Sequence, residues 1–172
     1  EIADGDWSSD VCSSDLQTAL ADKADTTSVR RLVERFKDAP PALRDRITEV
    51  FKTMGERGES VIREVLEEDI ASLRPHLAEI LETTGYVESR IRLLNHRDPN
   101  VRRDAASFLA LVGSEAAFRG IVMAARDPDS EVRVQVTRAL ERLGSEDGKE
   151  ILEALENDPD RRIRKYTHWA LQ

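Results

Sequence analysis

The sequence has few of the residues that support disulfides, aromatic clusters or membrane spans. It contains one cysteine, two tryptophans and two tyrosines among its 172 residues. The single cysteine, Cys12, lies within the first sixteen residues, so the rest of the chain offers no thiol nucleophile, disulfide or cysteine-based metal site. No apolar run approaches the roughly 18 residues that a membrane-spanning helix needs. No segment alternates apolar and polar residues between turn signals, as a half-buried strand does. We therefore predict an all-α chain with no membrane insertion in this segment.

A repeat of 31 residues is the strongest pattern in the chain. Val101-Arg102 recurs as Val132-Arg133 and as Ile163-Arg164, and Asp127-Pro128-Asp129 recurs as Asp158-Pro159-Asp160. Apolar residues inside each unit follow helical spacing, and a glycine follows the first helix. A unit of this size cannot bury its own apolar face, so neighbouring copies must stack on one another.

The repeat predicts a right-handed α-solenoid of antiparallel helix pairs, with units of about 30 residues. We expect the solenoid to cover residues 17–172. The complete units are expected at 41–69, 70–98, 99–127 and 128–158, and partial units at 24–40 and 159–172.

This pattern resembles the HEAT-repeat family, most closely its short bacterial variety related to the phycobilisome-lyase-type repeats. The residues that carry the resemblance are Asp127 to Arg133, Ala139-Leu140 and Leu143-Gly144, with weaker copies elsewhere. The resemblance covers residues 27–172 and implies a fold. It implies no particular function, because the family serves many unrelated processes.

The first sixteen residues differ in composition from the rest. They contain five acidic residues, four serines and no lysine or arginine. The stretch 6–16, DWSSDVCSSDL, is similar to what a common sequencing adapter encodes; a natural disordered acidic tail is the alternative. Without residues 1–16 the net charge changes from −8 to −3. We also expect the chain to be a fragment truncated at both ends, since the last unit supplies one helix without its partner.

Arginines and aspartates recur in the repeat phase. A column of guanidinium groups could hold phosphates or carboxylates. The alternative, which we favour, is that these side chains link adjacent units through hydrogen bonds, as in similar repeats. The arginines are Arg44, Arg74, Arg102, Arg133 and Arg164, and the aspartates are Asp69, Asp98, Asp127 and Asp158.

The residues that known repeat enzymes use are absent. Iron enzymes built on this repeat, such as deoxyhypusine hydroxylase, bind their metal through His-Glu pairs, whereas His76, His96 and His168 are not followed by glutamate. DNA glycosylases of similar fold need a cationic groove with aromatics, but here charges of both signs are mixed. The chain shares only the repeat itself with bilin lyases, which is weak support for that activity. We predict no enzyme, cofactor, metal site or nucleic-acid partner.

The candidate binding residues fall into two groups. The second helices are expected to line the concave face with Arg63, Glu67, Arg92, Arg119, Met123, Arg126 and Glu153. Tyr166 and Trp169 align with outward positions of the preceding first helices, where exposed aromatics often mark contacts. Coverage of these two rings by sequence further along a parent protein is the alternative.

The predicted function is a non-catalytic scaffold that binds another protein, or another domain of its own parent chain. The alternative is a regulatory or accessory repeat segment of a larger enzyme or membrane protein. A helical-repeat enzyme of the glycosylase, metal hydroxylase or bilin lyase type is a third, less favoured interpretation. Cytoplasmic localisation is the default expectation.

Overall fold

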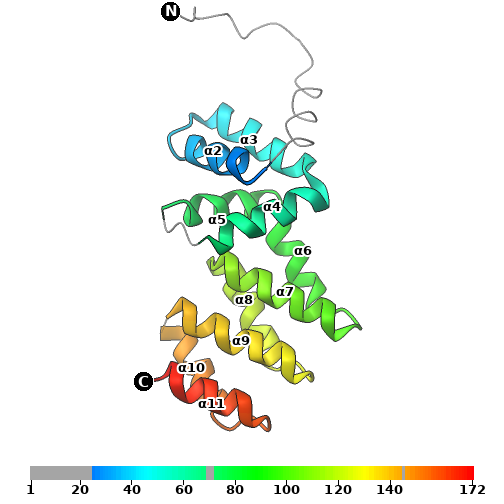
Figure 1. Ribbon diagram of the computed structural model, residues 1–172, viewed down its shortest axis with the longest axis vertical. Coiled ribbons are helices and arrows are strands. Elements are labelled where there is room, and N and C mark those ends of the chain that lie inside the picture. The colour runs from blue at the N-terminus through cyan, green and yellow to red at the C-terminus, as the bar shows by residue number, and fades with distance from the viewer. Residues whose placement is uncertain (1–24, 69–71, 145) are drawn as a thin grey trace, which may run out of the picture. The chain divides into compact units, whose positions relative to one another are not determined.

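The computed structural model describes residues 25–68, 72–144 and 146–172, and the tail at residues 1–16 lies outside them. The described residues form ten α-helices and no strand (Figure 1). The all-α prediction is therefore confirmed for this part of the chain. By its internal contacts the chain divides into two units, residues 1–62 and 63–172.

The first unit contains α2 (Thr26–Lys37), α3 (Pro41–Thr53) and the beginning of α4 (Gly55–Glu67). Helix α2 begins after Asp25, whose carboxylate accepts a hydrogen bond from the Ser28 amide at 2.7 Å. This bond lowers the pKa of Asp25 and satisfies an otherwise unpaired N–H of the first turn. Helices α2 and α3 pack together. Their buried residues are Val29, Val33 and Phe36 on α2 and Ile47, Val50 and Phe51 on α3.

The second unit contains seven further helices in sequence. They are α5 (Arg74–Thr83), α6 (Tyr86–Leu93), α7 (Pro99–Val112), α8 (Glu115–Ala124), α9 (Ser130–Leu143), α10 (Glu146–Leu155) and α11 (Arg161–Ala170). The first helices of successive repeats pack side by side, α7 on α9 and α9 on α11. The second helices α8 and α10 pack on α7 and α9. This is the helix-pair arrangement of an α-solenoid.

The ends of the repeated helices follow from local backbone chemistry. Helices α7 and α9 end at Gly113 and Gly144, with φ of 65° and 57°, in the left-handed region that favours glycine. The same first helices begin after an aspartate. Asp98, Asp129 and Asp160 are the N-caps of α7, α9 and α11, and each carboxylate accepts an amide hydrogen bond from the first turn.

The core of the second unit lies between the first and second helices. Phe108 and Leu109 of α7, Leu140 of α9 and Ile163 of α11 are fully buried, as is Ile121 of α8. These residues occur at the repeated apolar positions of the sequence. Burial of such side chains away from water supplies the main favourable contribution to folding.

Candidate interaction surfaces

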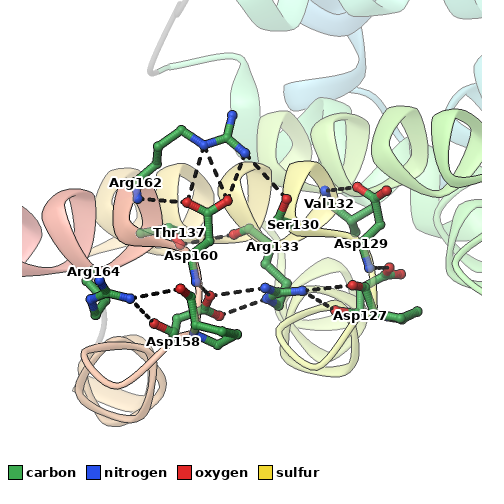
Figure 2. Close-up of polar contacts among 12 residues, drawn as sticks. Asp127, Asp129, Ser130, Val132, Arg133, Thr137, Asp158, Asp160, Arg162 and Arg164 are labelled. Atoms are coloured by element: carbon green, nitrogen blue, oxygen red, sulfur yellow. Dashed lines mark hydrogen bonds and ion pairs between the residues drawn. The ribbon is translucent and has the colours of Figure 1, made fainter.

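Arg133 links two successive turns of the repeat. It lies near the start of α9, and its Nε and Nη2 donate to the Asp158 carboxylate at 2.8 and 3.0 Å. Its Nη1 donates to the carbonyls of Asp127 and Pro128 at 2.8 and 3.1 Å. Figure 2 shows this guanidinium between the turn that precedes its own helix and the turn that precedes α11. One side chain thereby joins two repeats.

Arg102 makes the same contacts one repeat earlier. Its Nε and Nη2 donate to the Asp127 carboxylate at 2.7 and 2.9 Å, and its Nη1 donates to the carbonyls of His96 and Arg97. Both carboxylates are almost fully buried. The interpretation that arginine and aspartate link adjacent units is therefore confirmed at Arg102 and Arg133. Bidentate pairing of this kind fixes geometry as well as charge. We call these two arrangements the arginine rungs.

Both rung carboxylates are ionised by their hydrogen bonds. Burial by itself would raise the pKa of Asp127 and Asp158, but bonds from the guanidinium groups and from the amides of Asp129 and Asp160 leave each pKa below its ordinary value. The same pairing raises the pKa of the partner arginines Arg102 and Arg133. Each rung is therefore an ion pair at neutral pH.

The turn before α7 differs from the sequence alignment. Asp98 was aligned with Asp127, but it is the N-cap of α7 and so corresponds to Asp129 and Asp160. His96 occupies the place of the rung carboxylate. Its carbonyl accepts from the arginine six residues later, and its Nδ1 accepts from the Asp98 amide at 3.1 Å. The alignment is wrong here because the residues missing from this shorter repeat precede His96, so the turn from His96 to Arg102 keeps the length of the turn from Asp127 to Arg133.

Among the described residues, Arg44 and Arg74 make backbone contacts that differ from those of Arg102 and Arg133. Arg74, at the start of α5, donates to the Leu111 carbonyl near the end of α7 at 3.1 Å. Arg74 therefore contacts the end of α7, whereas Arg102 lies near the start of this helix. The packing of α5 against α7 thus differs from the packing of α7 against α9. Arg44 of α3, in the first unit, donates to the carbonyls of Ala39, in the loop before α3, and of Lys37, at the end of α2. Asp69 lies outside the described residues.

Three of the predicted second-helix residues lie on or directly after α8. Arg119 and Met123 are exposed on the helix at helical spacing, and Arg126 is exposed in the turn that follows the C-cap Ala125. Met123 is 55% exposed, and the neighbouring Val122 is also exposed. The burial of Ile121 beside them shows which side of the apolar run faces the core. We call Arg119, Val122, Met123 and Arg126 the α8 face.

The other second-helix candidates lie on different helices. Glu153 is exposed on α10, 31 residues after Val122. Arg92 is exposed on α6, which packs on α8, and its Nε lies 3.4 Å from a carboxylate oxygen of Glu88. Glu67 is exposed at the end of α4. These three residues are accessible, but the structure does not gather them onto the α8 face.

Arg63 is engaged inside the second unit. Its Nη2 donates to Asp104 of α7 at 3.1 Å, and its guanidinium lies 5.5 Å from the centre of the Phe108 ring. Arg90 of α6 contacts the same two residues, at 3.3 Å and 5.2 Å. Burial lowers the pKa of Arg90, which the charge of Asp104 opposes. Arg63 thus covers a core phenylalanine and is only 24% exposed.

Tyr166 and Trp169 lie together on α11, as their spacing predicts. Their ring centres are 6.1 Å apart at an interplanar angle of 75°, an edge-to-face contact. Trp169 is 54% exposed, whereas Tyr166 is half-buried. Lys165 lies over the tryptophan ring at 4.6 Å, and Arg138 of α9 lies over the tyrosine ring at 5.4 Å. The pair forms an aromatic patch bordered by cations.

Among the described residues, no three His, Cys, Asp or Glu side chains lie close enough together to hold a metal ion. None of their helices combines the length and the apolar character that crossing a membrane requires.

Several solved structures and one family model are similar to this chain. The chain is similar to solved structures of an engineered protein from the Northeast Structural Genomics Consortium (17% identity, TM-score 0.44, covering 90% of this chain and 85% of that one). It is also similar to a designed armadillo repeat protein in complex with the peptide (KR)4 (13% identity, TM-score 0.44, covering 91% of this chain and 89% of that one). Likeness at this level supports no functional argument. No curated protein matches the chain. The family model for HEAT repeats matches residues 87–172, half of the chain. The chain belongs to the HEAT-repeat family.

Proposed function

We propose that this chain is a non-catalytic scaffold that binds another protein, or another domain of its parent chain, through the α8 face. HEAT-type repeats create wide surfaces on which exposed residues can vary without disturbing the buried stripe. The α8 face is such a surface, because its four exposed residues lie opposite a buried side that packs on the first helices.

The exposure of Met123 and Val122 supports this proposal most directly. Among the described residues, the large apolar side chains that are exposed are Val122, Met123 and Trp169. Two adjacent residues of this kind favour a contact site, since burying them on a partner removes apolar surface from water. Methionine adapts its shape to irregular partners because it is unbranched and polarisable.

The charges that flank Met123 favour an acidic partner. Arg119 lies four residues before it on the same side of the helix, and Arg126 lies three residues after it in the turn that follows α8. An apolar anchor between two cations suits a partner segment with an apolar side chain between carboxylates. The arginines would speed encounter and select against basic partners.

The buried side of α8 holds this face in place. Gly120 approaches the neighbouring helices so closely that a Cβ there would lie 2.8 Å from Leu109 Cδ1 and 3.0 Å from Ile91 Cγ1. Ala117, Ile121 and Ala124 are buried beside it. A face carried by a tightly packed helix loses little conformational entropy on binding.

Site-specific photo-cross-linking in cells of the source organism tests the proposal. A photoreactive residue at position 123 should capture a discrete partner, and positions 119 and 126 should capture the same one. Glu141, an exposed residue on the first helix α9, is the matched control position and should not. Equal capture from positions 123 and 141, or capture from position 141 alone, would contradict binding through the α8 face.

The identified partner then allows a quantitative measurement. Met123→Glu should weaken its affinity by tenfold or more, because truncating or charging a central anchor typically costs at least about 1.4 kcal/mol. Arg119→Glu should mainly slow association and reduce its salt dependence. Glu141→Lys should leave both quantities unchanged.

A further inference from the structure

A groove of about 390 Å³ lies between α5 and the turn that joins α7 to α8. All of its lining residues belong to the second unit. The groove occurs where the packing of the helices is irregular. Helix α9 packs on α7 extensively, whereas α5 meets α7 mainly at its end, where Arg74 donates to the Leu111 carbonyl. The space that a closely packed neighbour would fill therefore stays open beside α5.

The floor of this groove is apolar. Ala78 of α5 and Val112 of α7 line it and are otherwise buried, and Pro75 at the start of α5 is exposed along it. Gly113, which ends α7 with a φ of 65°, leaves this part of the lining without a side chain. A floor of this kind fits an aliphatic chain, since covering it removes apolar surface from water.

The rim of the groove is acidic. Glu79 and Glu82 lie one helical turn apart on α5, and Glu115 lies across from them in the first turn of α8. All three side chains are exposed, and those of Glu82 and Glu115 meet no cation among the described residues. Arg74 also lines the groove, but it is held by the Leu111 carbonyl. Three carboxylates and one guanidinium give the lining a formal charge of −2.

We propose that this groove binds an arginine side chain of a partner protein. The aliphatic part of the side chain lies on the apolar floor, and its guanidinium binds the carboxylates of Glu82 and Glu115 from the two walls. The groove shares no residue with the α8 face, so the inference goes beyond the proposed scaffold function.

The spacing of the carboxylates favours a guanidinium over other cations. The three glutamates do not lie close enough together to hold a metal ion. A guanidinium is planar and directs five N–H donors outward, so one group can bind carboxylates on both sides of the groove. A lysine ammonium is a compact and strongly hydrated point charge, which suits a single wall better.

The exposure of the rim favours an arginine that belongs to a protein over a free cation. Each exposed ion pair contributes little, because water screens it. A free cation would therefore be held weakly. A partner chain adds contacts on the surface around the groove, and its arginine then enters the groove at a high effective concentration.

Titration of short peptides into the full isotope-labelled chain tests the proposal. The tripeptide acetyl-Ala-Arg-Ala-amide should cause saturable shifts in the NMR amide signals of Ala78, Gly113 and Ser114. Its citrulline counterpart has nearly the same shape but no charge, and should bind about fivefold more weakly or worse. A counterpart with the guanidinium on a side chain two methylenes shorter should also bind several times more weakly, because it covers less of the apolar floor.

Matched variants locate the binding site. Glu82→Gln and Glu115→Gln should each weaken binding of the arginine peptide about twofold to threefold, as expected for exposed pairs. Glu141→Gln, at an exposed glutamate of α9, should leave the affinity unchanged. Equal binding of the citrulline peptide or of the shortened peptide would overturn the proposal, as would shifts that arise away from the groove.

Spermidine distinguishes a free polyamine from a protein arginine. Saturable shifts of the same amides by spermidine, reduced by Glu82→Gln, would identify a free polyamine as the ligand and overturn binding of a partner. Shifts spread over the exposed carboxylates without saturation support the proposal. Met123→Ala should not change the affinity for the arginine peptide, and the titrations do not depend on cross-linking from position 123. Each of the two proposals can therefore fail without the other.

Discussion

The turns before α9 and α11 and the turn before α7 share one backbone arrangement but differ in chemistry. The first two hold a buried aspartate that an arginine of the preceding repeat binds. The turn before α7 holds His96 in that place, and Arg74 of the preceding helix pair donates to Leu111 instead. The common backbone therefore does not depend on the ion pair. All three turns share one contact: an arginine near the start of the following helix donates to the carbonyls of the turn.

A different polar cluster joins α7 to the helices before it. Asp104 accepts from Arg63 and Arg90, which also cover Phe108. Its carboxylate is 54% exposed, whereas the rung carboxylates are buried. Solvent screens an exposed pair, so the ordered rungs should contribute more to stability than this cluster.

The largest expected effect is the loss of a rung carboxylate. Asp158→Ala leaves the buried guanidinium of Arg133 without its partner and should lower the free energy of unfolding by about 3 kcal/mol. His96→Ala, at the corresponding place before α7, should cost less than about 1 kcal/mol, because it removes one amide hydrogen bond. Urea unfolding of both variants measures the difference; equal losses would contradict the assignment.

Acid should remove the stabilising contribution of the rung carboxylates. The pKa values of Asp127 and Asp158 are lower in the folded chain than their ordinary value near 3.8. Their stabilising contribution is present above that value and is lost as the pH falls through the lower folded pKa. Unfolding free energies at pH 7 and pH 3 should therefore differ less in Asp158→Asn than in the wild type. The same difference between pH 7 and pH 3 in Asp158→Asn and in the wild type would show that other carboxylates dominate the pH dependence of stability.

A smaller effect is expected at the exposed cluster. Asp104→Ala should cost about 1 kcal/mol, since it removes partly screened contacts of two arginines. Salt of about 0.5 M should reduce this cost, whereas the cost of Asp158→Ala should change little. Urea titrations at low and high salt measure both. A salt-independent cost at Asp104 would indicate that packing on Phe108 carries the effect.

The smallest effect is expected from restoring the missing aspartate. His96→Asp places a carboxylate where the Asp98 amide can still donate, but Arg74 is at the far end of α7 and cannot complete a rung. The free energy of unfolding should change by less than about 0.5 kcal/mol. A large gain would show that an arginine reaches this turn after all. Thermal unfolding at neutral pH is sufficient to decide.

The repeat predicts the structure best in the part of the chain where the units follow one another at a constant spacing. The stacking of α7, α9 and α11, their glycine ends and the arginine links at Arg102 and Arg133 all follow from residues that recur at one spacing. The α-helical fold and the exposure of Met123 and Trp169 follow from helical spacing in the same way.

The structure could not be predicted from the sequence where the same residues are compatible with two local arrangements. An Asp-Pro pair can fill either the rung place or the cap place of the turn, and the hydrogen bonds of Asp98 show that it fills the cap place. Arg74 shares the Arg102 phase, but the direction of α5 depends on packing that no local pattern encodes. Arg63 was expected on an open face, and its engagement with Asp104, 41 residues away, has no local signal. The expected unit boundaries all stay a prediction: 41–69, 70–98, 99–127 and 128–158, with partial units at 24–40 and 159–172.

The position of Trp169 gives this chain a built-in optical reporter. It is one of two tryptophans, the other being Trp7, and its indole is exposed next to Lys165 on α11. Replacing Trp7 with phenylalanine would leave a single fluorophore, whose emission maximum should shift to shorter wavelength when its surroundings lose water. Events at the last helix could then be followed in real time without a chemical label.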